Sequence, residues 1–292
     1  MTGIYRGFSA KALERQYSPS SMVGDITPFI RRYGAESAAA RQRLACQADI
    51  RYGPDAGQTL DILAAGSGQV PEKGAPVHVF IHGGYWRELS KDDSAFAAPG
   101  FVERGVTFVA LNYSLAPTAS IDRIVAQCRQ GIAWLYRNIA DFGGDGGRLS
   151  VSGHSAGGQL VLMLLATDWA GDYGLPETVI RGATSMSGIY DLAPLLLTTV
   201  NDPLGMDAGT ARRNSPAANI IRSDVPLVIA VAERDTGEFR RQARDFAESW
   251  RKAGNTGLFL DLPGRHHFDI VFDLANPDSP LGHAVLAQAG IG

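Results

Sequence analysis

Gly153-His154-Ser155-Ala156-Gly157 forms a G-x-S-x-G pattern around a serine. An apolar run from Leu149 to Ser152 predicts a strand before it, and Gln159 to Ala166 predicts a helix after it. A sharp turn from strand to helix strains the serine backbone and leaves room only for small neighbours. The pattern alone also fits a helix start rich in small residues. The flanking strand and helix favour Ser155 as a nucleophile.

A serine hydroxyl needs a base that accepts its proton and a carboxylate that orients this base. In hydrolases with such a turn, the acid and then the histidine follow the serine along the chain. Three histidines meet this condition: His266, His267 and His283. His266 and His267 share a loop after a predicted strand, Leu258 to Leu262, so position leaves both open. His283 falls in the final predicted helix, where we expect a surface residue.

Asp235 is the favoured acid. It comes just after the predicted strand Leu227 to Val231, and a helix is predicted to begin near Gly237. Loops at the carboxyl ends of parallel strands meet at one edge of the sheet, where such folds build their sites. Glu233 in the same loop is a rival that also suits a salt bridge or a pocket, and Asp191 after the preceding strand is another.

His82-Gly83-Gly84-Tyr85-Trp86 follows the predicted strand Val77 to Ile81. Small residues let a chain turn back so that amides point into a site and bind an oxygen that becomes negative during acyl transfer. We expect the amides of Gly84 and Tyr85, together with that of Ala156, to form this oxyanion hole.

Two other patterns suggest metal or phosphate binding and are interpreted differently. His78 and His82 are four residues apart, too far along a strand to share a metal ion, and His82 is expected to brace its loop. Gly143-Gly144-Asp145-Gly146-Gly147 precedes a strand and lacks the Gly-Lys-Ser/Thr of a phosphate loop, so a flexible turn is expected. The sequence predicts no metal and no cofactor.

Strand-like and helix-like segments alternate after residue 49, beginning with a short pair at Ile50 to Tyr52 and Thr59 to Leu63. Apolar residues from Ile121 to Ile139 recur with a 3.6-residue period and predict a crossover helix, and a second such helix is predicted from Phe239 to Trp250. This alternation predicts an α/β fold with a mainly parallel central sheet flanked by helices.

We expect one domain over residues 1–292, with the catalytic core at 46–292. Residues 1–45 show little strand character and predict short helices and loops, an N-terminal extension that is a candidate cap over the pocket. Pro194 to Pro216 is aperiodic and predicts a loop or small cap segment at the pocket mouth.

Composition points to a small-molecule substrate. The formal net charge is -3, with 27 basic and 30 acidic side chains, which gives no positive field for nucleic acid or an anionic membrane. Cys46 and Cys128 suggest no disulfide framework, and the first residues lack the apolar core of a signal peptide. No apolar run is long enough to span a membrane. We expect a cytoplasmic protein, and the sequence is compatible with a homodimer.

The motifs together resemble the hormone-sensitive-lipase-like branch of the α/β hydrolases, with Tyr113-Ser114-Leu115-Ala116-Pro117 as a further match. Within this branch, the Gly-Tyr-Trp ending of the loop at 82–86 is similar to kynurenine formamidases, also called arylformamidases. The segments Glu233 to Phe239 and His267-Phe268 resemble that family's acid and histidine regions, and the likeness extends to Tyr17-Ser18-Pro19-Ser20 and Leu60-Asp61-Ile62.

The resemblance implies a catalytic triad of Ser155, Asp235 and His267, and it favours His267 over His266. It also implies the hydrolysis of N-formylkynurenine to kynurenine and formate through a formyl-enzyme. Trp86 and Tyr190 are then candidate aromatic contacts for the aryl leaving group, with an ordinary core role as the alternative.

Arg87, Arg265 and Glu233 are candidate polar contacts to the substrate, with a solvated surface role as the alternative. A carboxylesterase for small acyl or aryl esters would use the same triad without any changed residue. A ligand-binding protein without catalysis on the same fold is an alternative of a different class.

Overall fold

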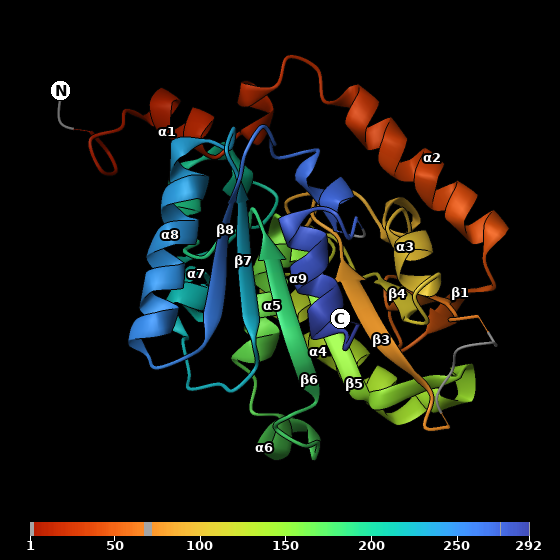
Figure 1. The fold of residues 1–292 in the computed structure, drawn as a ribbon. Coiled ribbons are helices and arrows are strands. Elements are labelled where there is room, and N and C mark those ends of the chain that lie inside the picture. The colour runs from red at the N-terminus through yellow and green to blue at the C-terminus, as the bar shows by residue number, and fades with distance from the viewer. Residues whose placement is uncertain (1–2, 67–71, 275, 292) are drawn as a thin grey trace.

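The computed structural model describes residues 3–66, 72–274 and 276–291 (Figure 1). Within this part of the chain eight strands form one sheet, in the order β1-β2-β4-β3-β5-β6-β7-β8. The strands are β1 (Cys46–Arg51), β2 (Thr59–Leu63), β3 (Ala75–Ile81), β4 (Thr107–Leu111), β5 (Gly144–His154), β6 (Ile180–Met186), β7 (Leu227–Ala232) and β8 (Gly257–Leu262).

The sheet is antiparallel at one edge and parallel elsewhere. Strand β2 pairs antiparallel with both β1 and β4, and every other pairing is parallel. Parallel strands need crossover connections, which here contain α3 (Ala98–Val102), α4 (Ile121–Asn138), α5 (Ala156–Leu165) and α8 (Gly237–Lys252). Helix α9 (Pro280–Gln288) follows the last strand, and together these helices cover both faces of the sheet. The predicted α/β class and the mainly parallel sheet are confirmed.

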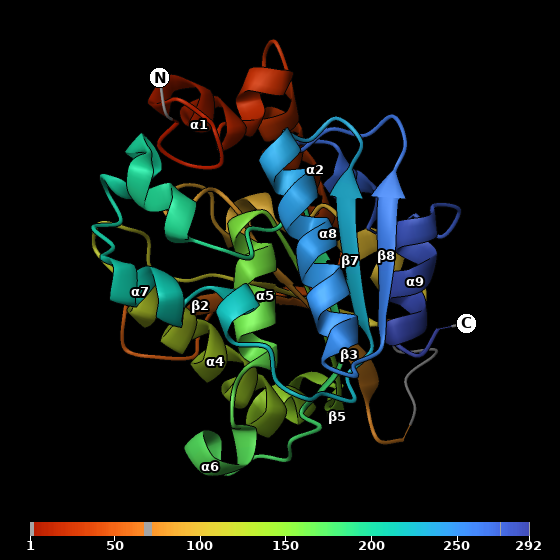
Figure 2. The same cartoon turned by 90° about the vertical axis from the view of Figure 1, so that its left-hand side faces the viewer.

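Side chains of the central strands point alternately to the two faces of the sheet and pack into two separate hydrophobic cores. In β3, Val77, Val79 and Ile81 join the core beneath α4, α5 and α8, whereas Phe80 joins the core beneath α3 and α9. Figure 2 shows α8 and α9 on opposite sides of β7 and β8. This two-faced burial is why the inner strands appear in the sequence as unbroken apolar runs.

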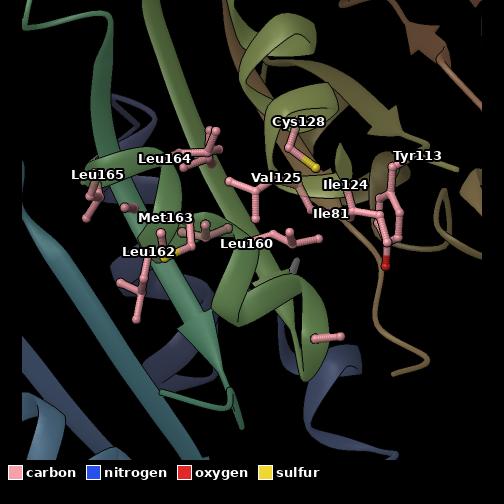
Figure 3. Close-up of a cluster of buried hydrophobic side chains, with 14 of the residues drawn as sticks. Ile81, Tyr113, Ile124, Val125, Cys128, Leu160, Leu162, Met163, Leu164 and Leu165 are labelled. Carbon is pink, nitrogen blue, oxygen red and sulfur yellow. The ribbon is translucent and has the colours of Figure 1, made fainter. Parts of the chain in front are cut away.

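Helices α4 and α5 meet in the larger of these cores (Figure 3). Ile124, Val125 and Cys128 of α4 are buried there beside Leu160 and Leu164 of α5. The periodic apolar stripe that predicted α4 is therefore its buried face.

The predicted flexible turn at 143–147 is wrong. Gly143 has φ 77° and ends η3 (Ile139–Phe142), but Gly144 already belongs to β5 and pairs with Ala75 of β3. A Cβ on Gly144 would lie 2.6 Å from Ile139 Cγ1 and 2.8 Å from Val77 Cγ2. Glycine is present here because the strand begins in close contact with its neighbours, not because the chain turns freely.

The N-terminal segment lies across the carboxyl ends of the strands, along the top of the molecule from α1 to α2 in Figure 1. It consists of α1 (Ala10–Gln16), η1 (Pro19–Met22) and α2 (Thr27–Arg43). The fully buried carboxylate of Asp61 holds its far end, because it accepts from Arg41 Nε at 2.7 Å and pairs with Lys91 Nζ at 3.0 Å. An ion pair this buried fixes geometry more than it adds stability.

The remaining helices are short. They are α6 (Trp169–Tyr173) and, in and after the predicted loop at 194–216, η4 (Ala193–Leu197), η5 (Thr199–Asn201), α7 (Ala208–Arg213) and η6 (Pro216–Ala218), with η2 (Lys91–Asp93) and η7 (Ile270–Asp273) elsewhere. Among the described residues, no helix combines the length and the apolar character that crossing a bilayer requires.

Candidate active site

Ser155 occupies a strained turn between β5 and α5. Its φ of 55° and ψ of -118° lie outside the regions that non-glycine residues prefer, and its amide donates to the Met186 carbonyl at 2.9 Å. Strain of this kind persists only where the surroundings hold the backbone firmly. The turn lifts the hydroxyl group above the carboxyl edge of the sheet, as the G-x-S-x-G pattern predicts.

The flanking glycines permit the close packing that holds this turn. A Cβ on Gly153 would lie 2.3 Å from the Gly157 carbonyl oxygen, and one on Gly157 would lie 2.1 Å from the Ile81 carbonyl oxygen. Both contacts are far shorter than any side chain tolerates, so each position accepts only glycine.

His267 and Asp235 come together from the loops that follow β8 and β7. The Nδ1 atom of His267 lies 2.8 Å from Asp235 Oδ1, and both side chains are buried. The other carboxylate oxygen of Asp235 accepts from the Ser187 hydroxyl and from the Ala232 amide. A proton on Nδ1 is thereby held toward Asp235, which leaves Nε2 of His267 as the basic nitrogen.

The rival residues are engaged elsewhere. Nδ1 of His266 accepts from the Phe268 amide. Glu233 is exposed, and its carboxylate accepts from the Gly264 amide at 2.6 Å, so it braces the histidine loop. Asp191 accepts from the amide of Ala193, in its own loop.

His283 is exposed on α9, as expected.

The loop after β3 presents free amides beside Ser155. Gly84 has φ 93° and Tyr85 has φ 48°, and within the described part of the chain no hydrogen-bond acceptor reaches their amides or that of Ala156. A Cβ on Gly83 would lie 3.1 Å from Ser155 Cβ, which places this loop directly against the serine. Free amides in this position can bind a developing oxyanion.

His82 braces this loop, as expected. Its ring stacks on Tyr113 with centroids 4.2 Å apart, and its Nδ1 lies 2.9 Å from the Gly83 carbonyl oxygen. Burial lowers the pKa of His82 to about 4, so the ring is neutral at physiological pH. Among the described residues no cluster of histidine, cysteine or acidic side chains could hold a metal ion.

Ser155 and His267 open into one cavity of about 440 Å³. Tyr85 and Phe268 contribute aromatic surface to it, and Arg87 and Glu14 contribute charge. The N-terminal segment lines much of the wall, with Glu14, the run from Tyr17 to Ser20, Ile26, Ile30 and Tyr33. Thr199 and Val200 add to it from the predicted loop at 194–216.

Trp86 and Tyr190 do not line this cavity, which corrects the expectation that they contact the leaving group. The indole of Trp86 is fully buried and its Nε1 donates to Gln159 Oε1 at 3.0 Å. Tyr190 stacks on Phe246 and its hydroxyl lies 3.1 Å from Ser185 Oγ. Both side chains belong to the core, because each finds its polar partner inside the protein.

Of the three candidate polar contacts, only Arg87 lines the cavity. It forms an ion pair with Glu88 at 3.2 Å. Arg265 instead forms an ion pair with Asp273, and the Glu233 carboxylate accepts a hydrogen bond from the Gly264 amide.

Sequence reasoning did not single out His154, although it stands next to the serine. Its ring lines the cavity and lies 4.7 Å from the His267 ring, centroid to centroid. Burial, and after it the charge of His267, keeps the pKa of His154 well below its usual value. His154 is therefore a neutral, space-filling neighbour of the base at physiological pH.

The sheet topology, the strained serine and the His–Asp pair define an α/β hydrolase. The BD-FAE family model matches residues 60–249. The chain is 34% identical to the kynurenine formamidase of Danio rerio, over 98% of both proteins. The chain therefore belongs to the kynurenine formamidase family.

More distant relatives include esterases. Esterase LipQ of Mycobacterium tuberculosis is 30% identical over 84% of this chain and 59% of its own length. A crystal structure of a proposed thioesterase from Silicibacter sp. TM1040 superposes with a TM-score of 0.79 at 28% identity, covering 94% of this chain and 98% of that one.

The buried histidines predict how stability depends on pH. Burial lowers the pKa of His78 to about 3, whereas an unfolded histidine titrates near 6.5. The unfolded chain therefore binds more protons below pH 6.5, and the free energy of unfolding falls as the pH drops from 7 to 5. His78 alone accounts for about 2 kcal/mol of this fall.

Urea unfolding at pH 7 and pH 5 measures this effect, with His78→Gln as the comparison. The variant should lose less stability between the two pH values than the wild type. Equal losses would show that His78 is not a neutral buried group.

Proposed function

We propose that this enzyme hydrolyses N-formylkynurenine to kynurenine and formate, with Ser155, Asp235 and His267 as its catalytic triad. The observation that carries the proposal is the His267–Asp235 hydrogen bond beside a strained serine and three free amides, in a chain of the kynurenine formamidase family. The amides of Gly84, Tyr85 and Ala156 form the oxyanion hole.

The first half of the reaction transfers the formyl group to the enzyme. His267 Nε2 takes the proton of Ser155 Oγ while this oxygen attacks the formyl carbon, and the three amides bind the oxyanion that forms. The protonated Nε2 then gives its proton to the aryl nitrogen, the C–N bond breaks and kynurenine leaves. Protonation of the nitrogen is essential because an amide anion is a poor leaving group.

The second half releases formate. Water attacks the formyl ester on Ser155 while His267 Nε2 accepts a proton from it, and the same amides bind the second oxyanion. The ester C–O bond breaks, Oγ regains its proton from His267, and formic acid leaves as formate. Asp235 stabilises the charged imidazole through its hydrogen bond with Nδ1.

The cavity suits a small substrate that carries opposite charges. Its volume of about 440 Å³ falls within the roughly 300–1,000 Å³ of small-molecule sites. The amino acid part of N-formylkynurenine bears a carboxylate and an ammonium group. Arg87 can pair with the carboxylate. Glu14 also lines the cavity, where its carboxylate oxygens accept from the amide and the hydroxyl of Thr199, and its negative charge suits the ammonium group.

Carboxylesterase activity is the second candidate. The esterase LipQ is a relative, and the same groups would hydrolyse a small ester. Only an activated aryl ester could lose its leaving group without protonation.

A cytoplasmic location also belongs to the proposal. Cys46 and Cys128 are both free thiols, as is usual in a reducing compartment.

Replacement of Ser155 by alanine tests the nucleophile and the substrate together. The kcat/KM for N-formylkynurenine should exceed that for a short-chain p-nitrophenyl ester in the wild type. Both activities should fall by at least about 10³-fold in Ser155→Ala, because the covalent step is lost. Steady-state kinetics with both substrates gives the answer.

If the wild type hydrolyses only the ester, the formamidase proposal fails and the esterase remains. Unchanged turnover in Ser155→Ala would remove the nucleophile assignment itself.

Replacement of Arg87 by methionine tests recognition of the substrate carboxylate. The KM for N-formylkynurenine should rise about tenfold or more, since a charged hydrogen bond is lost, while kcat stays similar. The decarboxylated analogue of the same formamide supplies the control, because its KM should not change. An equal rise of KM for both compounds would mean that Arg87 shapes the cavity but does not bind the substrate carboxylate.

A further inference from the structure

Two residues at the end of α1, Gln16 and Tyr17, are bonded to the loop that carries the acid. The Thr236 hydroxyl donates to the Gln16 carbonyl oxygen at 2.5 Å. In return, Gln16 Oε1 accepts from the Glu238 amide at 3.0 Å. These contacts join positions about 220 residues apart in the sequence, and Thr236 directly follows Asp235.

Gln16 thereby caps α8 from outside the helix. The first amides of a helix have no partner within it, and the residue before the helix normally supplies one from its side chain. Thr236 holds this position, but its hydroxyl makes no cap and bonds to Gln16 instead. The start of α8, and with it the loop of Asp235, therefore depends on the N-terminal segment.

The side chain of Tyr17 is fixed to the same helix. Its hydroxyl donates to Glu238 Oε2 at 3.0 Å and accepts from Gln242 Nε2 at 2.8 Å, and the whole residue is buried. Arg241 pairs with Glu238 at 2.7 Å and neutralises its buried charge. Burial, followed by the negative charge of Glu238, raises the pKa of Tyr17, so the hydroxyl keeps its proton.

The backbone of Tyr17 binds the other side of the site. Its carbonyl oxygen accepts from the Tyr85 hydroxyl at 2.5 Å. Tyr85 has a φ of 48°, a strained value for a residue with a side chain, and its amide is one of the three free amides described above. A strained residue stays in place only when other contacts hold it, and this hydrogen bond is one such contact.

We infer that Gln16-Tyr17 is a positioning unit that ties the oxyanion loop, through Tyr85, to the acid loop, through Thr236. It takes no part in bond making. It acts by fixing the positions of the Tyr85 amide and the Asp235 carboxylate relative to each other. The same N-terminal segment reaches the histidine loop, where the Tyr33 hydroxyl donates to the Phe268 carbonyl oxygen at 2.5 Å. This inference rests on the roles proposed above for Tyr85 and Asp235.

Two substitutions each remove a hydroxyl group that donates to the unit: Tyr85→Phe removes the bond to the Tyr17 carbonyl oxygen, and Thr236→Val removes the bond to the Gln16 carbonyl oxygen. A third variant carries both substitutions. All are assayed with a short-chain p-nitrophenyl ester, which needs the same site but no formamide specificity. Tyr52→Phe is the matched control, because it also removes a tyrosine hydroxyl bonded to a backbone carbonyl at 2.5 Å, on Asn112.

We expect each single variant to lower kcat about 5- to 20-fold with KM within about twofold, since the loss concerns the transition state. The Tm should fall by no more than about 4 °C, in line with one lost hydrogen bond. The double variant should lose less than the product of the two single losses, because both bonds end on the same dipeptide. Tyr52→Phe should keep its kcat.

Three results would overturn the inference: an unchanged kcat in both single variants, a raised KM at constant kcat, or losses that multiply in the double variant. If Tyr85→Phe does not fold, Gln16→Ala takes its place and must also lower kcat at constant KM. Failure of the formamidase proposal would show in the substrate preference of the wild type. Failure of this inference shows only in the variants.

Discussion

The strained backbone of Ser155 is the constraint on which the site depends. A φ of 55° is unfavourable for serine and survives because β5, α5 and the end of β3 meet at contacts that only glycine permits. The same packing brings Gly83 against the serine and so sets where the amides of Gly84 and Tyr85 can lie. The two-faced core supplies the rigidity, because it leaves the strand ends no freedom to spread.

The other groups reach Ser155 from distant parts of the chain. Parallel strands deliver Asp235 and His267 to the same edge, and their hydrogen bond fixes which imidazole nitrogen is free to act as a base. The N-terminal segment lines much of the cavity wall and forms hydrogen bonds to the loops that carry Tyr85, Asp235 and His267. The N-terminal segment and the candidate site therefore share one hydrogen-bonded framework.

Much of this arrangement could be predicted from the sequence, because it follows from local patterns. Buried parallel strands appear as apolar runs, and the order serine, acid, histidine limits the candidates for each role. The direction of a side chain cannot be predicted in this way: the indole of Trp86 lies in the core, where its Nε1 donates a hydrogen bond to Gln159 Oε1. The contacts of Gln16 and Tyr17 are equally hidden, since their partners lie far away along the chain and two of the hydrogen bonds end on backbone carbonyl oxygens.

Covalent labelling tests the central claim most directly. A fluorophosphonate reacts with a serine only when a neighbouring base and oxyanion hole activate it. Incubation followed by peptide mass spectrometry should find one adduct per chain, on Ser155, and the rate should collapse in His267→Ala but not in His266→Ala. An adduct on another residue, or a rate that depends on His266 instead of His267, would contradict this account of the site.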